Sequence, residues 1–143
     1  MSIDVHADFR PWLRDIIRIC GMLNVTRVTI LPTEYTSHAD VGRNTVCISF
    51  AECAEYSMHP VRALAHELRH IQQWQTGRLG MTIEGITQWD LKYYIEDNFA
   101  SHYAAPWERD ANEFESNYMD EYGSRYESTE TRELHRKIYL GAA

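Results

Sequence analysis

The sequence predicts an α+β fold, and three observations lead to this prediction. Four segments have apolar residues three and four positions apart, which is the spacing of amphipathic helices. These segments are 9–23, 60–76, 106–122 and 130–140. Two shorter segments, 25–31 and 45–50, are rich in β-branched residues and alternate apolar with polar residues, as half-buried strands do. No repeat, low-complexity tract or linker interrupts the chain, so we expect residues 1–143 to form a single domain.

The N-terminal half is expected to form the scaffold. Trp12, Ile16 and Leu23 lie on one face of the first predicted helix, which makes that face suitable for a core. The first strand should end at Pro32, because proline has no backbone N–H to donate to a sheet. The polar residues 33–44 predict turns between the two strands, and the second strand should bury one of its faces.

The helix at 60–76 should begin at Pro60 and end before Gly77, since these residue types suit the first turn and the C-terminal cap. Its core-facing stripe is expected to consist of Val61, Leu64, Leu68 and Ile71. A separate polar sector, suited to solvent or to polar partners, consists of Arg62, Arg69 and Gln73. Residues 81–99 carry mixed strand and helix signals, so their structure is left open.

Charge and composition exclude several classes of function. The chain has 21 acidic and 14 basic residues, a net charge of -7, which disfavours nucleic-acid backbones and anionic membranes as partners. No secretion signal and no apolar stretch of the roughly 18 to 20 residues that a membrane span needs is visible. The three cysteines lack a C-x-x-C spacing, so we expect reduced thiols in a cytoplasmic protein.

One motif predicts chemistry: His66-Glu67-Leu68-Arg69-His70. Residues four apart on a helix lie about 6 Å apart along its axis and on one face, so His66 and His70 can bind one metal ion. Glu67 lies beside that point, where it can take a proton from a water molecule. This H-E-x-x-H arrangement is typical of zinc peptidases, and the alternative is a pair of solvated surface histidines.

A catalytic zinc site needs a third protein ligand, and Glu108 is the first candidate. The helix at 106–122 has a core stripe of Trp107, Ala111, Phe114, Tyr118 and Tyr122. Its outer face consists of Arg109, Asp110, Glu113, Asn117 and Asp120. Glu108 lies at the edge of the apolar stripe, where a carboxylate needs a partner or a metal ion. Asn112, one turn on, is placed to hydrogen-bond a ligating histidine. Glu115 is the second choice as ligand, and Glu108 as a helix cap is the alternative.

These two segments together resemble a known family. His66-Glu67-Leu68-Arg69-His70, followed by Glu108-Arg109-Asp110-Ala111-Asn112-Glu113-Phe114, resembles the zincin metallopeptidases, and among them the ImmA/IrrE type, whose second motif reads E-x-x-A-N-x-F. The step of 38 residues from His70 to Glu108 is longer than that family usually shows, and no DNA-binding or sensor segment accompanies the motifs. The resemblance implies gluzincin-like chemistry on a minimal zincin domain, with the third ligand on the C-terminal helices.

The resemblance implies a zinc-dependent peptidase that acts on a peptide or protein substrate. His66, His70 and Glu108 would hold Zn²⁺, with Glu67 as general base. A further donor to the oxyanion is expected from Tyr93, Tyr94, His102 or Tyr103, each of which can equally be an aromatic core or surface residue. The resemblance also implies that an extended substrate pairs with an edge strand, either 45–50 or 25–31.

Alternative functions use the same residues. A non-catalytic protein-binding module could keep the zincin fold, although such a module has no need of Glu67. A hydrolase of a non-peptide amide would use the same ligands, whereas a structural zinc site would need a fourth. Imidazole and carboxylate also bind iron and manganese. The remaining histidines (His6, His38, His59 and His135) are expected at the surface, and 127–137 as a solvated helix face.

Overall fold

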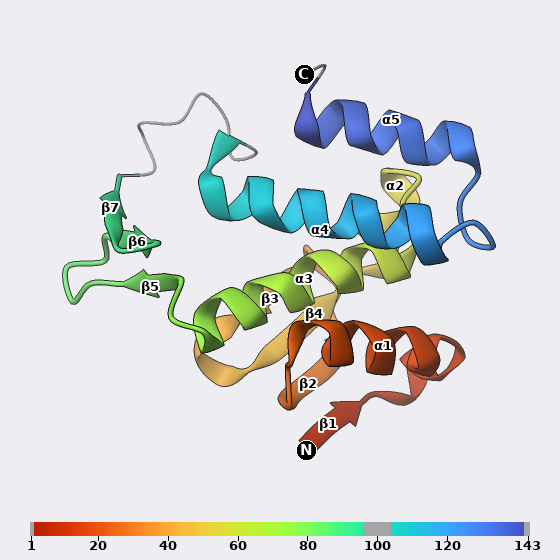
Figure 1. The fold of residues 1–143 in the computed structure, drawn as a ribbon. Helices are drawn as coiled ribbons and strands as arrows, with labels where there is room; N and C mark the ends of the chain where they lie inside the picture. The colour runs from red at the N-terminus through yellow and green to blue at the C-terminus, as the bar shows by residue number, and fades with distance from the viewer. Residues whose placement is uncertain (1, 96–103, 142–143) are drawn as a thin grey trace.

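A computed structural model describes residues 2–95 and 104–141, and it has the mixed α+β composition that the sequence predicts (Figure 1). The strands are β1 (Ser2–Val5), β2 (Arg27–Pro32), β3 (His38–Asp40), β4 (Thr45–Ile48), β5 (Leu79–Met81), β6 (Thr87–Trp89) and β7 (Lys92–Tyr94). The helices are α1 (Leu13–Leu23), α2 (Phe50–Glu55), α3 (Pro60–Gln75), α4 (Pro106–Tyr122) and α5 (Thr129–Leu140). Within the described part of the chain, none of these helices has the length and apolarity to cross a membrane.

The main sheet has the strand order β1-β2-β4-β3. β1, β2 and β4 run parallel, and β3 runs antiparallel to β4, with His38 opposite Cys47. Both strands that the sequence predicted are therefore internal, and the expectation that either one receives a substrate at a sheet edge is wrong. The edges are formed by β1 and β3, two strands of four and three residues that are too short to give a clear periodic signal.

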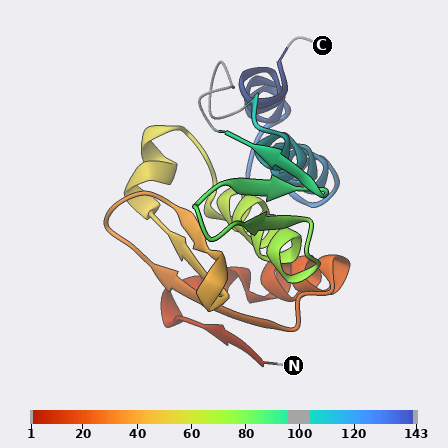
Figure 2. The ribbon, with the colours of Figure 1, turned by 90° about the vertical axis from the view of Figure 1, so that its left-hand side faces the viewer.

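α1 and α3 lie on one side of this sheet, and α4 and α5 follow as further layers (Figures 1 and 2). α3 lies between the sheet and α4, it also packs against α1, and α5 packs on α4. The predicted core stripe of α3 is confirmed, since each of its four side chains is fully buried. The small antiparallel sheet β5-β6-β7 follows the C-terminal end of α3 and lies apart from the main sheet.

Two predicted element boundaries are wrong for local reasons. The segment before Leu13 is a 3₁₀ helix that contains Pro11, so the regular helix begins later than expected. The second predicted strand ends at Ile48, because the hydroxyl oxygen of Ser49 accepts a hydrogen bond from the Glu52 N–H at 3.1 Å and starts α2. Residues 49–52 read Ser-Phe-Ala-Glu, which matches the capping-box pattern and predicts the start of a helix at this point.

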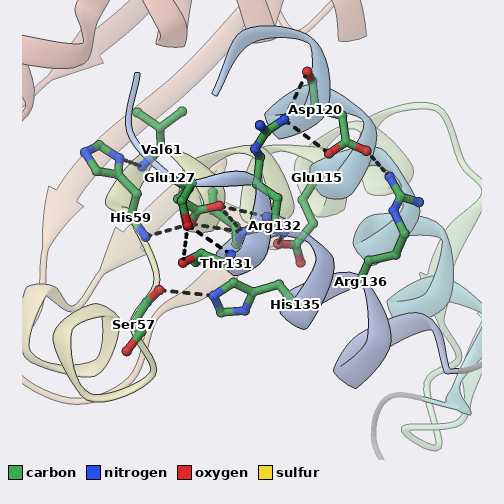
Figure 3. Close-up of polar contacts among 12 residues, drawn as sticks. Ser57, His59, Val61, Glu115, Asp120, Glu127, Thr131, Arg132, His135 and Arg136 are labelled. Carbon is green, nitrogen blue, oxygen red and sulfur yellow. Dashed lines mark hydrogen bonds and ion pairs between the residues drawn. The ribbon is translucent and has the colours of Figure 1, made fainter. Parts of the chain in front are cut away.

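Several polar residues that the sequence assigned to the surface are buried or half-buried. The exposed fraction of His135 is 2%, and its Nε2 lies 3.1 Å from the Ser57 carbonyl oxygen (Figure 3). Glu127 is also buried, so the segment 127–137 is not wholly a solvated face. Asp110 does not point away from the protein, because it accepts hydrogen bonds from Arg69 on α3. These residues are covered because α4 and α5 stack on α3, which local periodicity does not reveal.

Candidate metal centre

α3 and α4 bring the three predicted ligands to one point. His66 and His70 lie one turn apart on α3, with their Nε2 atoms 3.2 Å apart. Glu108, in the first turn of α4, places its Oε1 atom 3.0 Å from Nε2 of His66 and 2.8 Å from Nε2 of His70. The expected convergence of two imidazoles and a carboxylate from a distant segment is therefore present in the structure.

The three donor atoms fit a small tetrahedral metal ion. Zinc bonds of about 2.05 Å at tetrahedral angles place neighbouring donors about 3.3 Å apart, close to the observed 2.8 to 3.2 Å. The Nδ1 atoms of His66 and His70 each lie within 2.9 Å of a side-chain oxygen, so both rings can donate through Nδ1 and present Nε2 to a metal ion. Both Nε2 atoms face the same Glu108 oxygen, so a single cation at that point would be within reach of all three atoms.

Buried charge at this site is strongly negative. Glu67, Glu108, Glu115 and Glu127 are all buried, and in the described part of the chain the buried guanidinium among them is that of Arg62. Buried charges are costly unless they are paired or bound to a metal. Four carboxyl groups thus share one guanidinium and the two imidazoles, and a divalent cation would stabilise their ionised forms. The charge balance and the donor geometry thus both fit a metal ion.

Burial and the neighbouring carboxylates shift the pKa values of the site residues. Burial would lower the pKa of His66 and His70, but hydrogen bonds with Glu108, and for His66 also with Glu115, raise the pKa of both rings. Burial raises the pKa of Glu67, and the negative charges of Glu108 and Glu115 raise it further against the opposing effect of the imidazoles. A carboxylate of raised pKa is a better proton acceptor.

Glu67 is also within reach of the same point, so its role must be separated from that of Glu108. Ligand atoms of His66, Glu67 and His70 all lie within 4.8 Å of one another. The Glu67 Oε1 atom is 4.0 Å from Nε2 of His66, whereas the Glu108 Oε1 atom is 3.0 Å from it. The closer carboxylate suits the ligand role, and Glu67 lies beside the point of convergence without being as close to it.

The residues that orient the two imidazoles differ from the predicted one. The predicted hydrogen bond between Asn112 and a ligating histidine is not made: Nδ1 of His66 bonds Glu115 at 2.9 Å, and Nδ1 of His70 bonds Gln73 at 2.8 Å. Asn112 is buried, and its Nδ2 atom has no hydrogen-bond partner. Because Glu115 approaches Nδ1 of His66, its predicted second-choice role as a ligand does not fit. Hydrogen-bond partners on Nδ1, here Glu115 and Gln73, fix the tautomer and orientation of metal-binding histidines.

A cleft of about 470 Å³ opens beside the point of convergence. Its described lining comes from the edge strand, α2 and the loop after it, α3, α4 and α5, and it consists of Ser37, His38, Ala39, Glu52, Tyr56, Met58, Ala63, His66, Glu67, His70, Glu108, Asn112, Glu115 and Tyr139. Sequence reasoning missed Tyr139, because α5 carries no motif.

The expectation that Tyr94 faces the cleft is not supported: its ring packs edge-on against Trp107 in a separate apolar cluster. Tyr93 is exposed, and His102 and Tyr103 lie outside the described residues.

None of the family models, curated proteins or solved structures compared with this chain matched it, so the fold and the site carry the functional argument.

Proposed function

We propose that this chain is a zinc-dependent metallopeptidase of the zincin type. The observation that carries the proposal is the meeting of His66 Nε2, His70 Nε2 and Glu108 Oε1 within 3.2 Å, with the buried Glu67 carboxylate beside them in the lining of a cleft. Two imidazoles, one carboxylate and an open side are the ligand set of a catalytic zinc ion, whereas a structural zinc site is closed by four protein ligands.

The residues of the chain have distinct tasks in this proposal. A bound zinc ion supplies Lewis acidity, which lowers the pKa of water and polarises the scissile carbonyl. Glu67 accepts the proton of the attacking water and delivers it to the leaving amine, and burial strengthens this role by raising the pKa of its carboxyl group. Glu115 and Gln73 hold the two imidazoles in the orientation that zinc needs.

The edge strand β3 supports a peptide as the substrate. In the described sheet β3 pairs with β4 on one side, and Ser37, His38 and Ala39 line the cleft. An extended peptide could add to such an edge through main-chain hydrogen bonds, and its backbone would then run along the cleft that Glu67 also lines. A non-peptide amide would make no use of this edge, so β3 favours peptide hydrolysis over that alternative.

Tyr139 is the proposed donor to the oxyanion. The described lining of the cleft includes two phenols, Tyr56 and Tyr139, and Tyr139 is the less exposed of the two. A hydroxyl group in a partly dehydrated cleft stabilises developing negative charge more strongly than one in bulk water. This assignment replaces Tyr94, whose ring packs against Trp107.

Glu67→Gln tests the proposed function. The variant should retain zinc and lose hydrolysis of an unstructured peptide library by about 10² to 10⁴-fold, because the amide cannot accept the proton. Zinc content after dialysis and the rate of peptide cleavage, with and without chelator, are the two measurements. Glu113→Gln, an exposed substitution on α4, is the matched control and should cleave as the parent does. A zinc-loaded parent without peptidase activity, or a Glu67→Gln variant as fast as the parent, would refute the proposal.

A further inference from the structure

The carboxylate that holds His66 is shared with a buried arginine. Oε1 of Glu115 lies 2.9 Å from Nδ1 of His66, and Oε2 of Glu115 accepts a hydrogen bond from Nη1 of Arg62 at 3.0 Å. Arg62 lies on α3 one turn before His66 and is fully buried. Each oxygen of Glu115 is therefore occupied, one by the histidine and the other by the guanidinium, and the direction of the carboxylate is fixed by both.

Arg62 is fixed in turn by Glu127. The Nε and Nη2 atoms of Arg62 donate to Glu127 at 2.8 to 3.2 Å, a forked contact of the kind that orients a guanidinium plane. Oε2 of Glu127 also accepts the backbone N–H of His59 at the start of α3, 3.1 Å away (Figure 3). The buried chain of contacts thus runs from Glu127 through Arg62 and Glu115 to His66.

The second imidazole is held by a different kind of partner. Nδ1 of His70 bonds the neutral amide of Gln73, whose Nε2 atom donates to Asp110 on α4 at 2.8 Å. His66 instead faces a full negative charge, which increases the basicity of its ring and its strength as a metal ligand. Among the described residues, Arg62 is the buried arginine or lysine that contacts this carboxylate, so it governs both the direction of the Glu115 carboxylate and the field that His66 experiences.

We propose that Arg62 is a positioning residue of the metal centre, which acts through Glu115 on His66 and is itself held by Glu127. This inference rests on the proposed function, because it takes His66 as a metal ligand. A merely structural arginine would hold α3, α4 and the segment before α5 together, and its loss would affect stability alone. Loss of a positioning arginine would also change the metal affinity of the site and the environment of the His66 ring.

The test uses four variants of the full chain. Arg62→Met combined with Glu127→Gln removes the guanidinium without leaving Glu127 charged and unpaired, and Arg62→Lys keeps the charge without the fork. Glu115→Gln removes the shared carboxylate, and the Arg62→Met/Glu127→Gln pair is then added to it. Ile19→Val, a fully buried substitution in α1, controls for loss of stability as such. The probes are Co²⁺ titration with its visible spectrum, and the ¹⁵N resonance of His66 Nδ1 in the metal-free protein.

We expect the Arg62→Met/Glu127→Gln variant to bind Co²⁺ about 10 to 100-fold more weakly, with a changed spectrum and a shifted His66 resonance. The Co²⁺ affinity of Arg62→Lys should lie between that of this variant and that of the parent. The Co²⁺ affinity of Ile19→Val should equal that of the parent. Adding Arg62→Met/Glu127→Gln to Glu115→Gln should weaken Co²⁺ binding no further, because both changes act through one carboxylate.

Unchanged Co²⁺ affinity and an unchanged His66 resonance in the folded Arg62 variants would overturn the inference, as would fully multiplicative effects of the Arg62 and Glu115 changes. If the parent binds no Co²⁺, the proposed function fails, and the His66 resonance then decides the inference alone. A shift on loss of Arg62 would keep its positioning role, and an unshifted resonance would remove that role too.

Discussion

Replacement of Glu108 by alanine should weaken zinc binding by at least 100-fold. Structural zinc sites with four protein ligands bind with about 10 to 16 kcal/mol, so one ligand contributes about 3 kcal/mol, and each 1.4 kcal/mol is a factor of ten. Glu108 Oε1 lies within 3.0 Å of both imidazole nitrogens and is the anionic member of the set, so its removal costs at least this average share. The loss therefore corresponds to about two orders of magnitude in the dissociation constant.

The assay is the rise in melting temperature on addition of zinc, together with metal content after dialysis. A 100-fold weaker site loses about 2.7 kcal/mol of zinc-dependent stabilisation at saturating metal. In a chain of this size about 1 kcal/mol shifts the melting temperature by roughly 3 °C, so the zinc-induced shift should shrink by about 8 °C.

Glu113→Ala is the matched control for this prediction. Glu113 lies on the same helix and is exposed, so the change removes one carboxylate of the same type without touching the imidazoles. Its zinc-induced shift should equal that of the parent. If Glu108→Ala keeps the full shift and retains zinc through dialysis, the assignment of Glu108 as the third ligand is wrong.

Two further predictions concern catalysis and stability. Tyr139→Phe should lower kcat about 100-fold with little change in KM, because an oxyanion donor acts in the transition state. Tyr35→Phe, a substitution at an exposed tyrosine, is the control and should leave kcat unchanged. Equal kcat values in the two variants would remove Tyr139 from the mechanism. Burial would raise the pKa of Asp15, but hydrogen bonds from Tyr118 and Tyr126 outweigh it, so its pKa is lowered in the folded state. The stabilisation is therefore complete above the unfolded pKa of about 3.9 and is lost as the pH falls through the lower folded value. Asp15→Asn should cost about 2 to 3 kcal/mol at pH 7, and urea unfolding should show this difference narrowing towards pH 3; a constant difference would contradict the assignment.

The features that could be predicted from the sequence depend on one helix at a time. The core stripe of α3 and the shared direction of His66 and His70 follow from helical spacing alone, and both are present in the structure. Glu108 could be selected because its position at the edge of an apolar stripe is also a property of a single helix. The predicted place of Glu108 therefore agrees with the structure, although its distance from α3 had no direct signal.

The features that sequence reasoning missed depend on how elements pack. Arg62 and Gln73 belong to a polar sector that is suited to solvent or polar partners, and only the crossing of α4 over α3 shows that both are buried among such partners. Glu115 and Asn112 lie on similar faces of α4, so spacing alone could not show which one reaches His66. β3 forms because β4 is available to pair with it, and its three residues carry no pattern of their own.

The shortness of β3 restricts what the proposed enzyme can cut. A three-residue strand extends for about 10 Å and offers about three main-chain hydrogen bonds to an added chain, each with a net contribution near 1 kcal/mol. This is less than the roughly 5 to 15 kcal/mol that keeps an ordinary domain folded. Binding to β3 therefore cannot extract a segment from a stable protein, and cleavage would be confined to tails, loops and chains that are already unravelled.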